Sequence, residues 1–213
     1  MTATATATMY YRDMPKMRDH GLASPEGFVD IVAFVLATIR QPFQRVNLAM
    51  ADIRANGENA ASLFGSKRDG YRYAVAHAHV LLAGMRAAIE TDDVVGAVDM
   101  LTNIPGLGVV KASFVAQIFG LEVACLDSHN LDRLGLAESA FKLAKSVKPE
   151  TKRAKIAAYV EACRAGAPAS QRKTFAAYWW DSWCEYVAGN RANKALATGD
   201  AVSAFHYDCL MGA

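Results

Sequence analysis

Asp127 is the residue of this chain that could most directly do chemistry. It follows a short apolar stretch, residues 123–126, and stands nineteen positions after Gly108. A carboxylate fixed beside a reacting centre can stabilise a developing positive charge, and it can orient or deprotonate an attacking water. Asp127 also suits the N-cap of a helix that begins at Ser128, a common use of aspartate. The two roles are compatible, because a cap holds the carboxylate in place.

The segment 104–108, Ile-Pro-Gly-Leu-Gly, predicts a tight turn between two helices. Pro105 ends the first helix, while Gly106 and Gly108 permit positive φ and leave the backbone unobstructed. The amides of Gly106, Gly108 and Val110 are then expected to point outward at the start of the next helix, where they would bind a phosphate. An ordinary turn between helices is the other interpretation of this segment.

Segment 104–108 and residues 126–130, Leu-Asp-Ser-His-Asn, together resemble the helix-hairpin-helix (HhH-GPD) DNA glycosylase superfamily. Its members include endonuclease III, the adenine glycosylase and the 8-oxoguanine glycosylases, which carry L-P-G-V-G followed at a similar distance by V-D-T-H or L-D-G-N. Residues 28–39 stand where the family has its first core helix, and residues 64–71 resemble its glycine/tyrosine/lysine connection. The resemblance covers roughly residues 24–134. It implies an all-α, two-lobed HhH-GPD-like fold without an iron–sulfur cluster.

The resemblance also implies a function for Asp127 and Lys111. It points to an N-glycosylase (EC 3.2.2 type) that removes a damaged or modified base, with Asp127 as the catalytic carboxylate. In lyase-type members a lysine follows the second hairpin glycine by two positions, where this chain has Val110. Lys111 comes one residue later, which rotates its side chain by about 100° on a helix. We therefore expect Lys111 to face away and to contact phosphate or solvent, and we predict monofunctional hydrolysis; Lys111 becomes the catalytic amine only if the hairpin has another register.

Further residues could contact DNA. The family extrudes its target base and fills the gap, and Arg40 or Gln41 stands where its wedge residue is expected. His129 could contact the phosphate or the sugar near Asp127, although a histidine at such a position is often structural. Residues 142–155 contain six basic side chains and one acidic one. We expect this run to follow the phosphates, with a solvated face as the alternative; its candidate contacts are Lys145, Lys148 and Lys152.

Helical periodicity runs through almost the whole sequence, and no stretch alternates as a strand would. The Ala/Thr alternation at the start predicts a flexible tail over residues 1–20, followed by a single helical domain over residues 21–213 with its hairpin at 101–119. The expected helices cover residues 28–39, 44–55, 71–89, 93–101, 111–119, 128–134, 139–146, 151–165 and 171–187.

Composition limits the class of protein. The chain has 213 residues, of which 53% are apolar and 21% charged, and this balance excludes a disordered chain. The net charge of +2 does not by itself indicate a nucleic-acid binder. The four cysteines match neither a zinc nor an iron–sulfur spacing, so we expect no metal and no cofactor. The longest apolar run, residues 28–39, is too short to span a membrane. With no export signal, we expect a cytoplasmic monomer that binds double-stranded DNA, nucleoid-associated or in an infected host cell.

Two other functions remain open at this point. Similar folds occur among phage enzymes thought to attach amino acids or polyamines to activated hydroxymethyl-pyrimidines in DNA. Valine at position 110 suits such a transferase equally well, because that reaction cuts no bond to the sugar. The other alternative is a non-catalytic DNA-binding module that keeps only the hairpin, and the carboxylate at Asp127 argues against it.

Overall fold

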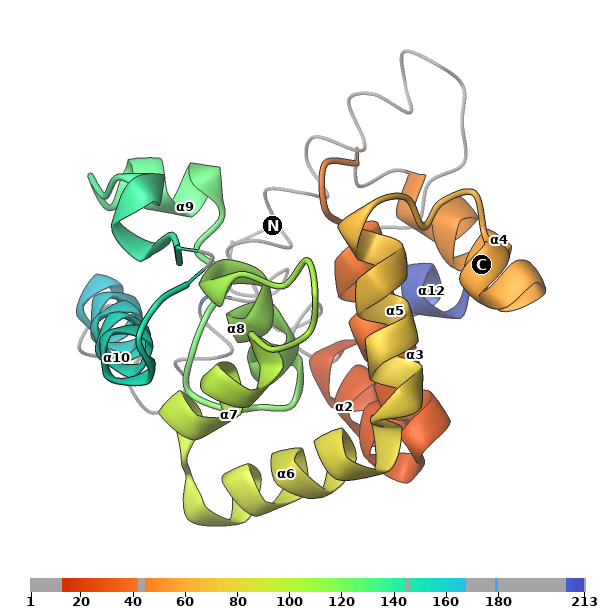
Figure 1. Ribbon diagram of the computed structural model, residues 1–213, viewed down its shortest axis with the longest axis horizontal. Coiled ribbons are helices and arrows are strands. Elements are labelled where there is room, and N and C mark those ends of the chain that lie inside the picture. Colours follow the sequence, from red (N-terminus) through yellow and green to blue (C-terminus); the bar gives the residue numbers. More distant parts are fainter. Residues whose placement is uncertain (1–12, 42–44, 145, 168–178, 180–205, 213) are drawn as a thin grey trace, which may run out of the picture.

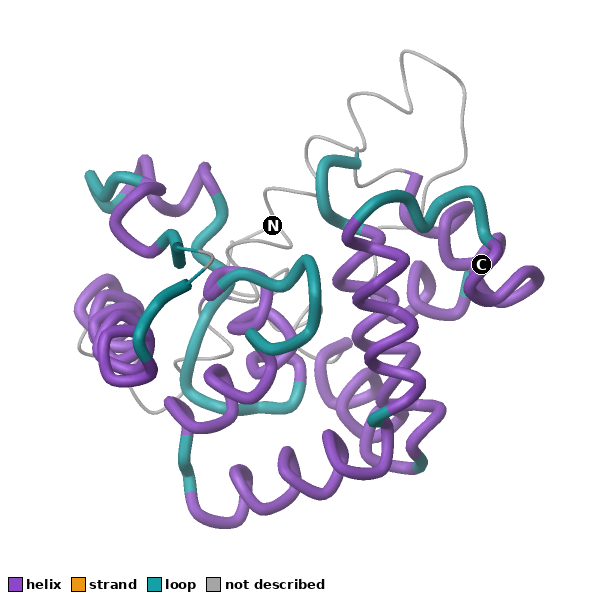
Figure 2. Tube along the Cα trace, in the orientation of Figure 1, coloured by secondary structure: helices purple, strands orange, loops and turns teal. Residues whose placement is uncertain are grey.

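The structure is a computed structural model, and it describes residues 13–41, 45–144, 146–167, 179 and 206–212 (Figure 1). Within these residues all regular structure is helical and no strand occurs, as Figure 2 shows. The expectation of an all-α chain is confirmed. None of the helices in these ranges is both long and apolar enough to cross a membrane.

Helix α3 (Pro25–Ala37) is the central helix of the described residues. Ser24 caps it by accepting a hydrogen bond from the Gly27 amide (3.1 Å), and Pro25 occupies its first turn. From Phe28 onward nearly every side chain of α3 is buried, which is typical of a helix covered on all sides. The helices that pack around it are α2 (Asp13–Ala23), α4 (Val46–Asn56), α5 (Ser66–Ala76), α6 (Ala78–Thr91), α8 (Val109–Ile118) and α12 (His206–Met211).

A second group of helices, within residues 94–101 and 128–166, lies on the other side of α8. Helix α6 runs along the base of the molecule and leads into α7 (Val94–Leu101), which packs against α6, α8 and α10 (Pro149–Gly166) (Figure 1). The chain then continues through α9 (Ser128–Arg133) and the short 3-10 helix η3 (Glu138–Phe141). Another 3-10 turn, η2 (Gly57–Asn59), follows α4. Helix α8 therefore joins the two groups, and the hairpin that precedes it lies between them.

The predicted tail is wrong over residues 13–20. These residues belong to α2, whose Met14 and Met17 are buried in the core. Helix α2 lies against α3 so closely that a Cβ on Gly27 would collide with the carbonyl oxygen of His20. Burial of the two methionines stabilises α2 there, and residues 1–12 lie outside the described part of the chain.

Two predicted helices also differ from the structure. The single helix over 71–89 is divided at His77, whose backbone (φ −116°, ψ 14°) leaves the helical region between α5 and α6. The helix over 139–146 is reduced to η3, because Lys142 is extended. Pro149 disfavours helical backbone at the residue before it, and Lys148 is extended accordingly. The predicted helix over 171–187 lies outside the described residues except for Trp179.

Candidate active site

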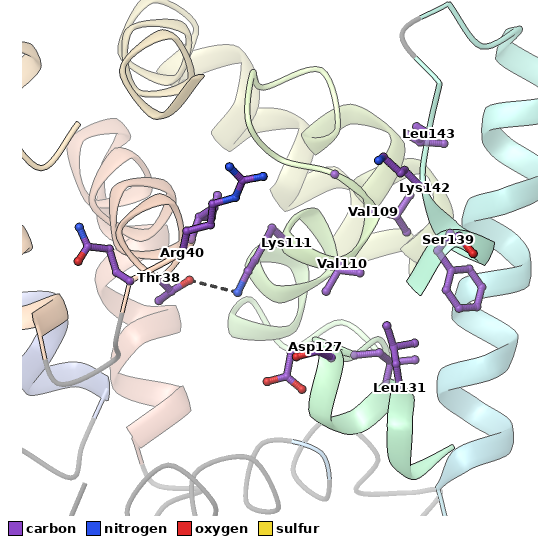
Figure 3. Close-up of a pocket in the computed structure, with 16 residues that line it drawn as sticks. Thr38, Arg40, Val109, Val110, Lys111, Asp127, Leu131, Ser139, Lys142 and Leu143 are labelled. Atoms are coloured by element: carbon purple, nitrogen blue, oxygen red, sulfur yellow. Dashed lines mark hydrogen bonds between the residues drawn. The ribbon is translucent and has the colours of Figure 1, made fainter. Parts of the chain in front are cut away.

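A pocket of about 900 Å³ opens between the two groups of helices (Figure 3). Its walls come from the end of α3, the first turn of α8, the start of α9, and η3 with the residues after it. The charged side chains that line it are Arg40, Lys111, Asp127 and Lys142. The pocket therefore combines one carboxylate with several cationic groups, and its size suits a ligand as large as a nucleotide.

The hairpin between α7 and α8 supplies one edge of this pocket. Gly106 has φ +87°, and a Cβ there would lie 3.2 Å from the carbonyl oxygen of Ser66. Gly108 is extended (φ −78°, ψ 178°), so our expectation of positive φ at this residue is wrong. A Cβ on Gly108 would meet nothing within 4 Å. The first turn of α8, with Gly108 as its N-cap and no side chain capping it, borders the pocket.

Asp127 is positioned by the segment before it, residues 121–126, which forms no strand and has no sheet to hold it. Buried polar side chains bind its backbone instead: the Tyr159 hydroxyl donates to the carbonyl of Ala124 (2.7 Å) and accepts from the amide of Leu126 (2.8 Å). The side-chain oxygen of Gln117 accepts from the amide of Cys125 (2.9 Å). The segment also bonds to itself, because the amide of Leu126 donates to the carbonyl of Ala124 (3.2 Å) and that of Val123 to the carbonyl of Leu121 (2.8 Å). The backbone of this strand-like stretch is thus bonded to side chains and to itself rather than to a neighbouring strand.

The carboxylate of Asp127 caps α9 and lines the pocket. Its Oδ1 accepts a hydrogen bond from the amide of Asn130 (3.0 Å). Asn130 is itself buried, and its side-chain amide donates to the carbonyl of Cys125 (3.3 Å). The capping role and the pocket position predicted for Asp127 therefore occur together. A carboxylate tied to the backbone on its own helix is held in a fixed place, as catalysis by charge requires.

Lys111 lies in the same pocket as Asp127, although it stands one residue after the family's lysine position. It is half-buried in the first turn of α8, and its Nζ donates to Oγ1 of Thr38 (3.2 Å), as the dashed line in Figure 3 shows. The ammonium also lies 5.5 Å from the ring centroid of Phe114. Val110, in the family's lysine position, lines the pocket as well. The first turn of α8 therefore presents both residues to this space.

The charges of Lys111 and Asp127 both affect the pKa of a buried thiol, that of Cys125. Burial raises the pKa of Cys125 to about 11, while the Lys111 charge lowers it and the Asp127 charge raises it. Cys125 is therefore a protonated, unreactive thiol behind the pocket. The described residues contain no group of three or more His, Cys, Asp or Glu side chains that could hold a metal ion.

Arg40 and Gln41 both line the pocket, at the end of α3. Arg40 is exposed and has φ +51°, an uncommon conformation for a residue with a side chain. Unfavourable backbone of this kind often occurs at binding sites. Thr38, which the sequence did not single out, begins this turn and accepts the hydrogen bond from Lys111. No motif could have revealed it, because the interaction depends on how α3 meets α8.

The basic run does not act as one surface. The ammonium of Lys152, a predicted DNA contact, pairs with the Asp99 carboxylate (2.8 Å) and donates to the side-chain oxygen of Asn103 (3.0 Å). That interaction joins α10 to α7. Lys148 is exposed at the start of α10 and is available to a ligand. Lys145 and the side chain of His129 lie outside the described part of the structure.

Comparisons of this chain with protein-family models, with curated proteins and with solved structures found no match. The resemblance to the helix-hairpin-helix glycosylases therefore rests on the residues of the hairpin and of segment 126–130. The geometry adds that these two segments border one pocket.

Proposed function

We propose that this chain is a DNA N-glycosylase with a two-lobed, HhH-GPD-like fold that hydrolyses the bond between a damaged or modified base and its sugar. The observation that carries the proposal is the placement of Asp127, at the start of α9, in one pocket with the first turn of α8. The sequence motifs alone predicted these two parts of the chain to act together. Double-stranded DNA is the proposed partner, bound by a monomer.

The chemistry assigned to the pocket needs a preorganised negative charge. As the base departs, positive charge develops on the sugar, and the Asp127 carboxylate stabilises it and orients the attacking water. A base within a duplex is out of reach, so the nucleotide must be extruded into the pocket. Arg40 and Gln41 at the rim are the side chains placed to occupy the gap left in the duplex. The uncapped start of α8 suits a backbone phosphate.

Mass spectrometry of DNA carrying modified bases, before and after incubation with the protein, tests this function. We expect a free base and an abasic strand. Asp127→Asn keeps the oxygen that caps α9 but loses the charge, so it should retain fold and DNA affinity while single-turnover cleavage falls by about 10²–10³. A gain in mass of the DNA would indicate the transferase instead. Unchanged DNA would indicate a non-catalytic binding module. Full activity in the folded Asp127→Asn variant would show that the Asp127 charge takes no part in the reaction.

The place of Lys111 in the pocket favours a second candidate, base removal coupled to strand cleavage through an amine–sugar adduct. We still expect monofunctional hydrolysis, because Nζ of Lys111 is held by the hydroxyl of Thr38. Borohydride treatment during turnover should therefore trap no protein–DNA complex, and the abasic product should stay uncut until base or heat is added. A trapped complex that disappears in Lys111→Gln would assign the second function.

A further inference from the structure

Lys67 is a buried cation without a hydrogen-bond partner in the described structure. It lies in the first turn of α5, only 3% of the residue is exposed, and no partner lies within reach of its Nζ. The nearest favourable group is the ring of Phe64, 4.5 Å from Nζ to the centroid. A cation–π interaction of this kind compensates only in part for the loss of water around an ammonium.

The start of α5 lies directly against the hairpin of the candidate active site. The turn at Gly106 approaches the backbone of Ser66, and a Cβ on Gly70 would collide with the carbonyl oxygen of Pro105. Figure 1 shows α5 alongside α3, with the loop before α8 beside it. Lys67 therefore belongs to the same corner of the molecule as the first turn of α8.

Lys111 is the charged neighbour of Lys67 in this corner. The pKa of Lys67 is lowered, first by burial and then by the positive charge of Lys111. Two ammonium groups that repel each other, one of them buried and without a partner, destabilise the protein by themselves. An oxyanion close to both ammonium groups would attract each of them, which offsets their repulsion, and it would give the Lys67 ammonium a hydrogen-bond acceptor.

We propose that Lys67 and Lys111 together bind a phosphate-type oxyanion where the start of α5 meets the hairpin that leads into α8, beside the pocket that Lys111 lines. Lys111 is the pocket-facing cation of this site and Lys67 is the buried one. The ligand is either a phosphodiester of the DNA strand or a phosphate or diphosphate group on a separate molecule. Only the DNA source rests on the proposed function; binding of the anion needs neither Asp127 nor turnover.

Thermal unfolding in phosphate-free buffer, with and without inorganic phosphate or pyrophosphate, tests the site. Either anion should raise the midpoint of the wild type. Lys67→Met should unfold at a higher temperature than the wild type without anion, because an unpartnered buried charge is gone, and it should lose the rise caused by the anion. Lys111→Gln should lose the same rise. Lys16→Met removes an exposed lysine far along the chain from this corner and should keep it.

DNA binding separates the two sources of the anion. Each duplex of a series carries one neutral methylphosphonate linkage, at a different position in the strand. At one of these positions the neutral linkage should weaken binding by the wild type about tenfold. In Lys67→Met the same linkage should have no effect. If free anions raise the unfolding midpoint but no linkage position affects DNA binding, the ligand of the site is a separate phosphate-bearing molecule. The proposal is overturned if Lys67→Met responds as the wild type does in both experiments, or if wild type responds in neither. Asp127→Asn should keep both responses, so failure of the glycosylase assignment would be seen separately.

Discussion

The two hairpin glycines differ in what their positions require. Gly106 has positive φ and lies against the backbone of Ser66, so a side chain there is strained and crowded. Gly108 is extended and open, so its backbone accepts any residue. At Gly108 a side chain would instead extend over the start of α8, where we place a phosphate. Stability and DNA binding can therefore be separated by substituting one glycine or the other.

Gly108→Val should fold with a loss of stability below about 1 kcal/mol, the cost of a poorer N-cap. Its affinity for duplexes of any sequence should fall about equally, since a blocked phosphate interaction carries no sequence information. The slope of log affinity against log salt concentration should flatten by about 0.9 for each phosphate that the variant no longer neutralises. Fluorescence anisotropy on several duplexes measures both quantities. Gly106→Val is the matched comparison and should lower the unfolding temperature. Unaltered affinity in folded Gly108→Val would exclude the hairpin from the interface.

At the scale of elements, a side chain of α10 helps to hold the segment before α9, together with Gln117 and Asn130. Tyr159 is buried and bonds both Ala124 and Leu126, so its hydroxyl links α10 to the backbone that carries Asp127. Burial raises the pKa of Tyr159 well above its usual value, which keeps the hydroxyl protonated as a donor. Tyr159 is therefore a positioning residue for the carboxylate, although it lines no part of the pocket.

Tyr159→Phe should lower the free energy of unfolding by about 1–3 kcal/mol, because two hydrogen bonds within the core are lost, although the amide of Leu126 and the carbonyl of Ala124 stay bonded to each other. Turnover should fall further than the unfolded fraction explains, since Asp127 loses its support, while duplex affinity should hold. Urea unfolding, binding and single-turnover assays together check this. Tyr73→Phe removes the hydroxyl of a half-buried tyrosine on a different helix, α5, and should change none of them. If turnover in Tyr159→Phe matches the wild type, the Tyr159 hydroxyl plays no part in positioning Asp127.

Local sequence predicted the elements whose hydrophobic pattern is strong. Helix α3 carries apolar residues at helical spacing from Phe28 onward, and the helix predicted over 28–39 overlaps the observed one over residues 28–37. Helix α2 was missed because few apolar residues, among them Met14 and Met17, mark its buried side. The break at His77 was missed because the helical pattern continues across it. Such features depend on packing between elements rather than on the segment itself.

The candidate site was predictable in part, for the same reason. The motif segments gave Asp127 and the hairpin, which do border one pocket. The hydrogen bond from Lys111 to Thr38 could not be predicted, because the position of a residue along its own helix does not show where α3 ends and offers an acceptor. Lys152 belongs to a basic run in the sequence, but in the fold its ammonium pairs with Asp99 of α7. Charge partners from distant segments are not visible in a sequence.

At the scale of the whole molecule, buried thiols make the fold sensitive to alkaline pH. Burial raises the pKa of Cys125 to about 11 and that of Cys163 to about 12, from an ordinary value of 9.0. Above pH 9 the unfolded chain therefore releases thiol protons that the folded chain retains. Stability present below pH 9 is lost as pH rises from there toward the folded pKa values. Lys67, whose pKa is lowered, acts in the opposite direction, so a difference between variants is the clean measurement.

Cys125→Ala should remove one of these two contributions. Each thiol lowers the free energy of unfolding by about 1.4 kcal/mol per pH unit between its unfolded and folded pKa values, so the variant should lose stability less steeply than the wild type between pH 9 and pH 10.5. Below pH 9 the two curves should run parallel, offset by the cost of the smaller side chain. Urea unfolding across this range measures the slopes, and Cys163→Ala should behave in the same way. Parallel curves throughout would mean that the Cys125 thiol titrates as easily in the folded protein as in the unfolded chain, and the segment before Asp127 would then be open to water.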